Sequence, residues 1–240
     1  MADDRPLIDI VLSPQLISAY EMPNAVAVVI DVLRASTTII TALEHGASAI
    51  YPLETVEEAE AFASKGKLVG AERNVVRCPF AQLGNDPFEY TPEMVKEQEI
   101  YFTTTNGTRT IKACMEAGYE VVIGSFINLS AIAKYCQNRN VLTVCAGWQG
   151  KPSKEDTLFA TALIEQLPEH QIVTDVSQML YEVYLQHKAE LIPYIKDSNH
   201  YPRMVRAGKD NSFEFCLTPD QSNTVPRASW TPEHAIRLTI

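Results

Sequence analysis

The chain has 240 residues, with 20 Lys or Arg and 30 Asp or Glu, so its formal net charge at pH 7 is −10. Hydrophobic residues make up 46% of it and charged residues 21%, which is typical of globular proteins and excludes a disordered or fibrous chain. The acidic balance argues against nucleic-acid binding, because that needs many Lys and Arg side chains on phosphates. It leaves room for a small anionic ligand held by a few local arginines.

Strand-like apolar runs alternate with helical patterns along most of the chain. Strands are predicted, in chain order, over residues 7–12, 25–32, 47–52, 67–70, 100–104, 119–123 and 141–146. Helices are predicted over residues 37–45, 55–64, from 92 onward, 109–117, 129–137 and 155–166, and a helix-rich region then extends to about residue 208. No element is predicted for residues 211–239.

This alternation predicts a single α/β domain, residues 1–240, with a largely parallel or mixed sheet. Residues 28–50 and 100–122 form a weak internal repeat at an offset of 72, which is compatible with two similar halves. Two equivalent loops would then flank one crevice at the carboxyl ends of the strands. The alternative is that all strand–helix–strand units look alike.

Two features bear on the compartment. No apolar run approaches the roughly 20 residues that span a bilayer, and the N-terminus is acidic where a signal peptide would be basic. The five cysteines are odd in number and include no Cys-x-x-Cys pair, so neither a disulfide framework nor a zinc knuckle is indicated. We therefore expect a reduced, cytoplasmic protein without a membrane or nucleic-acid partner. A homodimer is compatible with the sequence.

The first loop with a chemical signature follows the second predicted strand. Asp31 places a carboxylate at the end of a buried strand, and Arg34, Ser36 and Thr37 follow in the loop and the next helix's first turn. A carboxylate, a guanidinium and hydroxyls at a helix N-terminus suit a metal ion together with an oxyanion. The alternative is that Asp31 pairs with Arg34 while Ser36 caps the helix.

A second loop, residues 103–109, holds threonines, an Asn-Gly pair and an arginine between a strand and a helix. Its backbone N–H groups and hydroxyls can cradle a phosphate, although no GxxxxGK[ST] loop occurs in the chain. The alternative is a simple Asn-Gly turn with a threonine cap. The candidate binding residues of this loop are Thr104, Thr105, Asn106, Gly107, Thr108 and Arg109.

A third loop, residues 145–156, brings Gly147 and the adjacent carboxylates Glu155 and Asp156 to the start of a helix. Asp156 can instead serve as the capping partner of Ser153, three residues earlier. The loop therefore has a structural interpretation beside the functional one.

A fourth strand ends in Glu72 and Arg73, and Asn85 lies in the long loop that follows. A surface ion pair and a turn are the alternatives there. The histidines show no HxxxH or HxH spacing and no GxSxG occurs, so zinc and a serine nucleophile are not supported. Mg²⁺ takes oxygen ligands and keeps waters or phosphate oxygens. The predicted metal ligands are Asp31, Glu72, Glu155 and Asp156.

Eight short motifs occur in a specific order and spacing: Asp31-Val-Leu-Arg-Ala-Ser-Thr-Thr, Gly70-Ala-Glu-Arg, Gly84-Asn, Thr103-Thr-Thr-Asn-Gly-Thr, Gly124-Ser with Asn128, Cys145-Ala-Gly, Glu155-Asp156 and Val225-Pro226. From about residue 8 to 226 the chain resembles the 2-phosphosulfolactate phosphatase family. The resemblance implies a three-layer α/β/α fold and a Mg²⁺-dependent phosphatase. Such an enzyme hydrolyses 2-phospho-3-sulfolactate to 3-sulfolactate and phosphate, on a route towards coenzyme M.

On this interpretation the site combines catalytic carboxylates with an anion-binding shell. The catalytic residues are Asp31, Glu72 and Asp156. The substrate-binding residues are Arg34, Ser36, Thr37, Arg73, Asn85, Thr104, Thr105, Asn106, Gly107, Thr108, Arg109, Asn128 and Gly147. Because each group follows a strand-like run, we expect these regions to converge on one cleft at the carboxyl ends of the strands. We further expect three arginines to fork onto the substrate's anions, namely Arg34, Arg73 and Arg109.

The chain departs from the family pattern between residues 71 and 87. Ala71 intervenes before Glu-Arg, Cys78-Pro-Phe-Ala stands where Gly-Phe-Asp is usual, and Gly84-Asn-Asp-Pro replaces Gly-Asn-Ser-Pro. The alternatives are therefore a phosphatase of another small phosphorylated carboxylic acid and a non-catalytic binder of phosphorylated metabolites.

The nucleophile has two interpretations as well. Asp31 is either a metal ligand or the nucleophile itself. The two-aspartate mechanism of haloacid-dehalogenase phosphatases is not supported, because Leu33 stands where the second aspartate would be. We therefore favour a metal-bound water.

Overall fold

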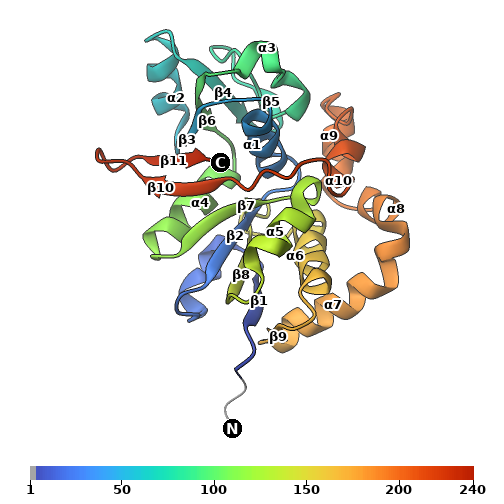
Figure 1. Cartoon of the computed structure of the whole chain (residues 1–240). Coiled ribbons are helices and arrows are strands. Elements are labelled where there is room, and N and C mark those ends of the chain that lie inside the picture. Colours follow the sequence, from blue (N-terminus) through green and yellow to red (C-terminus); the bar gives the residue numbers. More distant parts are fainter. Residues whose placement is uncertain (1–3) are drawn as a thin grey trace.

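In the computed structural model, which describes residues 4–240, every predicted strand forms, and short strands β5 and β9 and a C-terminal pair add to them (Figure 1). The strands are β1 Leu7–Val11, β2 Val26–Ile30, β3 Ala49–Pro52, β4 Leu68–Arg73, β5 Val76–Arg77, β6 Glu99–Thr103, β7 Glu120–Gly124, β8 Val141–Cys145, β9 Gln171–Ile172, β10 Arg227–Trp230 and β11 Ile236–Thr239. The α-helices are α1 Ala35–Glu44, α2 Val56–Ala63, α3 Pro92–Val95, α4 Gly107–Glu116, α5 Leu129–Cys136, α6 Lys154–Gln166, α7 Asp175–His187, α8 Leu191–Lys196, α9 Tyr201–Arg206 and α10 Phe213–Leu217.

The central strand β2 shows why helices cover both faces of the sheet. Val26, Val28 and Ile30 belong to one buried cluster, which includes residues of α5 and α6. Ala27 and Val29 belong to a second cluster, which includes residues of α1 and α4. Because successive side chains of a strand point to opposite faces, a strand that is apolar throughout requires a helical layer on each side. The expected three-layer α/β/α fold is confirmed.

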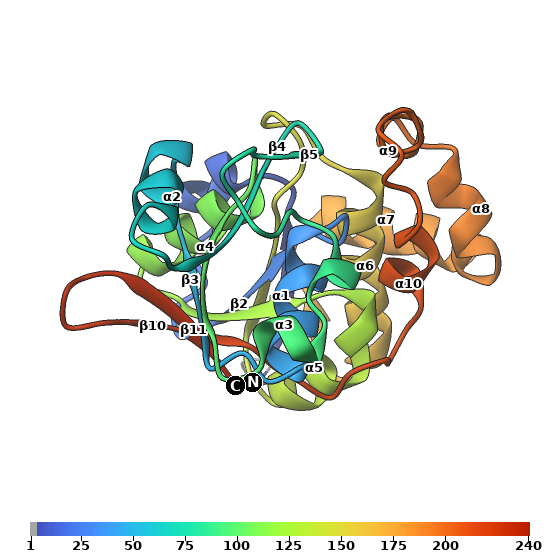
Figure 2. The ribbon, with the colours of Figure 1, turned by 90° about the horizontal axis from the view of Figure 1, so that it is seen from above.

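The sheet is mixed, with strand order β5-β4-β6-β3-β11-β10-β7-β2-β8-β1-β9. Strands β1, β8, β2 and β7 form one parallel group, and β3, β6 and β4 form another. The C-terminal hairpin lies between them, because β10 pairs with β7 and β11 pairs with β3, both antiparallel. Figure 2 shows the tip of this hairpin projecting on the side opposite α8 and α9.

The tail is thus a correction to the sequence analysis, which predicts no element for residues 211–239. It holds α10 and both strands of the hairpin. The pairing partners Ile50 and Val122 lie more than a hundred residues earlier in the chain than Leu238 and Arg227. A pattern read within a local window cannot anticipate such contacts.

The two repeat segments have matching elements. Helices α1 and α4 each have 10 residues and begin at Ala35 and Gly107, at the offset seen in the sequence. Each is followed by a glycine with positive φ, Gly46 at 95° and Gly118 at 82°. The loops before these helices lie in different parallel groups, after β2 and after β6.

Two further structural facts bear on the sequence analysis. Across residues 4–240, no helix is long and apolar enough to cross a membrane. The cysteines, all of which lie in that range, are free thiols and buried.

Candidate active site

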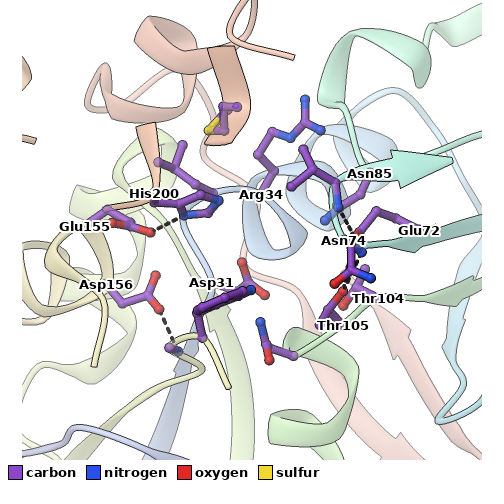
Figure 3. A pocket seen from close by; sticks show the side chains of 16 residues that line it. Asp31, Arg34, Glu72, Asn74, Asn85, Thr104, Thr105, Glu155, Asp156 and His200 are labelled. Atoms are coloured by element: carbon purple, nitrogen blue, oxygen red, sulfur yellow. Dashed lines mark hydrogen bonds and ion pairs between the residues drawn. The ribbon is translucent and has the colours of Figure 1, made fainter. Parts of the chain in front are cut away.

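The loops after β2, β4, β6 and β8 open into one cavity at the carboxyl ends of the strands (Figure 3). The space between its lining atoms, including its open mouth, is about 540 Å³. Among the residues predicted for the site, those that line it are Asp31, Arg34, Glu72, Asn85, Thr104, Thr105, Asn106, Gly147, Glu155 and Asp156. The expected convergence of the Asp31, Glu72, Asn106 and Asp156 regions is therefore found. Parallel strands end at the same edge, so residues distant in sequence meet there.

Asp31 lies between two groups of side chains in Figure 3, with Glu155 and Asp156 on one side and Glu72 and Thr105 on the other. Its backbone N–H donates to Ser36 Oγ at 2.9 Å, and its carbonyl accepts from the Ser36 N–H at 2.8 Å. Its Oδ1 accepts from the Ala35 N–H at 3.3 Å. The first turn of α1 therefore orients the carboxylate, whose Oδ2 accepts no hydrogen bond from residues 4–240.

Asp156 holds the two neighbouring loops in place. Its Oδ1 accepts from the Val32 N–H at 2.9 Å, and its Oδ2 accepts from the Gly147 N–H at 3.0 Å. Ser153 occupies the N-cap position of α6, but its side chain caps no backbone N–H. The Asp156 carboxylate thus accepts hydrogen bonds from the loops after β2 and β8 and does not form a capping box at the start of its own helix.

Glu155 is paired with His200, which is not among the residues predicted for the site. Its Oε1 lies 2.6 Å from His200 Nδ1, and its Oε2, fully buried, has no hydrogen-bond partner within residues 4–240. His200 immediately precedes α9, so this contact ties the helices after α7 to the start of α6.

Glu72 is held on the other side of the cavity by the hairpin of β4 and β5. Its Oε1 accepts from the Val75 N–H at 2.5 Å and from the Thr105 hydroxyl at 3.1 Å. The Thr105 Oγ1 in turn lies 3.4 Å from the Asn74 N–H. These bonds join the loops after β4 and β6, and the buried Thr104 hydroxyl beside them has no partner among the described residues.

Arg34 lines the cavity and forms a buried ion pair with Asp86. Its Nη1 lies 2.7 Å from Asp86 Oδ2, and both side chains are 4% exposed. The same nitrogen lies 3.3 Å from the Lys209 carbonyl and 3.4 Å from Ser212 Oγ. The alternative pairing of Arg34 with Asp31 is not observed. Substrate binding by Arg34 remains a prediction.

Several predicted binding residues do not line the cavity. Ser36 and Thr37 are buried and donate to the carbonyls of Val29 and Val32. Gly107 and Thr108 are buried at the start of α4. The other residues that lie outside the lining are Arg73, Arg109 and Asn128.

Local contacts account for the positions of Arg73 and Asn128. Arg73 donates to the carbonyls of Glu72 and Glu54 and to Thr103 Oγ1. Asn128 accepts from the Ser125 N–H in a capping arrangement, and Arg109 is exposed. The expected trio of anion-binding arginines is therefore not assembled around the cavity.

Other lining residues lie outside the sequence-based set: Leu33, Asn74, Val75, Trp148, His200 and Met204. Trp148 directly follows Gly147, a residue predicted for the site, so its position in the sequence could have indicated that it lines the cavity. His200 and Met204 come from the helix-rich region, where no sequence feature links them to the site.

The carboxylates interact strongly with one another. Burial, and then the Asp156 carboxylate, raise the pKa of Asp31 well above its usual range. Burial, and then the Glu155 carboxylate, raise the pKa of Asp156 to about 7. Removing a carboxylate from water and placing it beside another disfavours its charged form, and a bound cation would reverse both effects.

The donor set fits Mg²⁺ bound by one or two carboxylates with waters and phosphate oxygens. Among residues 4–240, no three His, Cys, Asp or Glu side chains form a ready ligand group. The four predicted ligands thus line one cavity without meeting at one point. The charge of a bound Mg²⁺ would stabilise the ionised forms of Asp31 and Asp156 most, since the pKa of each is raised.

Gly107 provides a test of how closely α4 approaches Asp31. A Cβ at this position would lie 2.8 Å from Asp31 Oδ2 and 2.7 Å from the Ala35 Cβ. We expect Gly107→Ala to displace the carboxylate and lower kcat about 10–100-fold, an effect typical of small misplacements in a site. Steady-state kinetics and a thermal melt measure the two consequences.

Gly118→Ala is the matched control, because it follows the same helix at the far end. No atom lies within 4 Å of the new Cβ, but φ is +82°, so the strained backbone should cost about 1–2 kcal/mol of stability. Its kcat should be unchanged. An unchanged kcat in Gly107→Ala would show that the position of the Asp31 carboxylate is not critical.

A family model described as 2-phosphosulpholactate phosphatase matches residues 11–230. The chain belongs to this family. A protein of Thermotoga maritima named probable 2-phosphosulfolactate phosphatase is 38% identical over 223 residues, covering 92% of this chain and 94% of that protein. Proteins of the same name are 39% identical in Caldanaerobacter subterraneus subsp. tengcongensis and 33% identical in Clostridium botulinum. These two cover 83% and 91% of this chain, and 86% and 95% of their own lengths.

Family membership agrees with the positions of the motifs. The motif residues Asp31, Glu72, Thr104, Gly147 and Asp156 all line the same cavity. The departing segment lies there too, because Asn85 is in the lining and Asp86 pairs with Arg34 in the wall.

Proposed function

We propose that this protein hydrolyses 2-phospho-3-sulfolactate to 3-sulfolactate and phosphate with the help of Mg²⁺. The observation that carries the proposal is the set of buried carboxylates that line one cavity together with the Thr104–Asn106 loop. Asp31, Glu72, Glu155 and Asp156 are between 2% and 9% exposed. A site that only bound anions would gain nothing from four buried negative groups. The place of the reaction on a route towards coenzyme M rests on the family resemblance alone, and its place in the cytoplasm rests on the cysteine pattern and the N-terminal sequence.

The phosphate is received by the loop after β6. Thr104 is 1% exposed, lines the cavity and has a hydroxyl with no partner among residues 4–240. Asn106 also lines the cavity and is the N-cap of α4, whose first N–H groups are unpaired within the helix. Hydroxyls and free N–H groups at a helix N-terminus bind phosphate oxygens without a buried cationic side chain.

The carboxylates on the opposite wall would hold the cation. When bound, Mg²⁺ would supply Lewis-acid polarisation of a phosphoryl oxygen and would offset negative charge that develops during hydrolysis. Asp31 and Asp156 are its proposed ligands, and Asp156 meanwhile keeps the loops after β2 and β8 at a constant separation through Val32 and Gly147. Glu155 holds His200 at the rim.

The attacking group is either water or Asp31 itself. The free Oδ2 of Asp31 is compatible with both roles. Leu33 follows where haloacid-dehalogenase phosphatases place a second aspartate, which argues against that mechanism. The stereochemical course at a phosphorus made chiral with oxygen isotopes distinguishes the two. Direct attack by water inverts the configuration, whereas attack by Asp31 followed by hydrolysis of the phosphoaspartate inverts it twice and so retains it.

Phosphate release from a panel of phosphorylated three-carbon acids, with and without EDTA, tests the function. We expect turnover of 2-phosphosulfolactate in Mg²⁺ and its loss in EDTA, with recovery when Mg²⁺ is restored. Full activity in EDTA would refute the metal requirement. Faster turnover of another acid in the panel would identify a phosphatase of different substrate, and no turnover of any ester would favour a binding protein.

A further inference from the structure

A second cavity adjoins the first on the side of α9, and the space between its lining atoms, including its open mouth, is about 1260 Å³. Trp148, Glu155 and His200 line both cavities, so the two share a wall. The second one has more cationic than anionic side chains in its lining, in an otherwise acidic protein; its lining carboxylates are Glu155 and Asp197. Its cationic lining residues are Lys151, Lys154, Arg203 and Arg206.

Arg203 is the best placed of these cations to receive an anion. Its guanidinium lies 3.8 Å from the centroid of the Trp148 ring, and the Arg203 side chain is half-buried. Among residues 4–240 the guanidinium makes no hydrogen bond and no ion pair; burial lowers the pKa of Arg203, and the charge of the Glu155 carboxylate partly offsets that. A guanidinium stacked on an indole keeps its N–H groups pointing outward in the ring plane, so the stack orients it without consuming its donors.

Both members of the stack are anchored to the candidate active site. Trp148 exchanges backbone hydrogen bonds with Lys151 at 2.8 and 3.0 Å, in the turn whose Gly147 N–H binds Asp156. Arg203 lies on α9, which begins just after His200, the partner of Glu155. Met204, its neighbour on the helix, is fully buried. The stack is therefore positioned relative to Asp156 and Glu155.

The other cations near the two cavities are engaged or more exposed. Lys154 donates to the carbonyls of Tyr194 and Asp197 and lies over the Tyr194 ring. Lys151 and Arg206 are exposed. Arg34 is occupied by Asp86, as described above.

We propose that Arg203, held on Trp148, binds the sulfonate of the substrate and so determines its specificity. The proposal rests on the proposed function, which places the phosphate over the carboxylates of the first cavity. The sulfonate is on the carbon next to the phosphorylated one, and the proposal directs it towards the second cavity, which shares Trp148, Glu155 and His200 with the first. A sulfonate is fully ionised and presents several oxygens to a planar fork of donors, which suits Arg better than Lys.

The test compares Arg203→Gln with the intact protein on 2-phosphosulfolactate and on 2-phospholactate, which lacks the sulfonate. We expect KM for 2-phosphosulfolactate to rise about 10–100-fold with little change in kcat, as for a lost charge-assisted contact that binds ground and transition states alike. Kinetics on 2-phospholactate should be unchanged, which also shows that the variant is folded. Arg203→Lys should recover only part of the loss.

Arg237→Gln is the matched control, since Arg237 is an exposed arginine on β11 and the net charge changes equally. It should leave both substrates unaffected. Equal losses on both substrates in Arg203→Gln, or no loss on either, would overturn the sulfonate assignment.

Calorimetric binding of 3-sulfolactate and lactate separates this proposal from the proposed function. If the intact protein binds 3-sulfolactate more tightly than lactate and Arg203→Gln removes that preference, the assignment of Arg203 stands even if no ester is hydrolysed. If hydrolysis occurs but the preference survives in Arg203→Gln, the function stands and the assignment fails. No preference in the intact protein also overturns the assignment.

Discussion

Replacing Asp31 by Asn should lower kcat at least about 100-fold and raise the thermal stability of the metal-free protein at pH 8. The loss of activity follows from removing charge next to the phosphate and the cation. The gain in stability follows because burial and Asp156 raise the pKa of Asp31, so its ionised form is costly in the folded state. Asparagine keeps an oxygen for the Ala35 N–H. Phosphate release and melting temperature measure the two effects.

The same reasoning gives the pH dependence of the metal-free protein. The pKa of Asp156 is raised to about 7 in the folded state, above the value of about 3.9 of an unperturbed Asp. Between these values the folded state holds more protons than the unfolded state, so the free energy of unfolding falls as pH rises. Saturating Mg²⁺ should reverse this fall in the intact protein and have less effect in Asp31→Asn.

Asp9→Asn is the matched control for a buried aspartate. Asp9 Oδ1 accepts from the hydroxyls of Thr174 and Ser177 and from the Ile10 N–H. It lies outside the lining of the first cavity. Its replacement should lower the melting temperature while leaving kcat close to normal. A lower melting temperature for metal-free Asp31→Asn, or full activity in that variant, would contradict the interpretation of Asp31.

Asp86→Ala should lower the free energy of unfolding by about 3–5 kcal/mol, because it leaves the Arg34 guanidinium buried without its counter-charge. The remaining contacts of that nitrogen, to the Lys209 carbonyl and Ser212 Oγ, are long at 3.3 and 3.4 Å. Urea denaturation followed by circular dichroism measures the change. The double variant Arg34→Met with Asp86→Leu should recover much of the loss, since no charge is then buried.

Glu120→Ala is the comparison at the surface. It removes an ion pair with Arg139 at 2.7 Å, whose side chains are 46% and 35% exposed, so the expected cost is at most about 1 kcal/mol. A similar small cost for Asp86→Ala would mean that water reaches Arg34 readily.

Local patterns in the sequence were sufficient to predict the strands and loops that carry the carboxylates. Continuous apolar runs such as residues 25–30 are typical of strands covered on both faces, and polar residues directly after them mark the carboxyl ends. Because parallel strands end at one edge, the regions of Asp31, Glu72, Asn106 and Asp156 are predicted to converge on one cleft, and all four residues line the same cavity. These inferences need only the periodicity of neighbouring residues and the geometry of parallel sheets.

Only the tertiary structure decided which partners these residues have. Arg34 is paired with Asp86, 52 positions away, and Glu155 with His200, 45 positions away. The C-terminal hairpin joins the two parallel groups through β7 and β3, and α9 places Arg203 on Trp148. Each of these contacts depends on packing between segments that are distant in the chain. Local periodicity carries no information about such packing. These charged groups come within hydrogen-bond distance only because the fold places distant segments side by side.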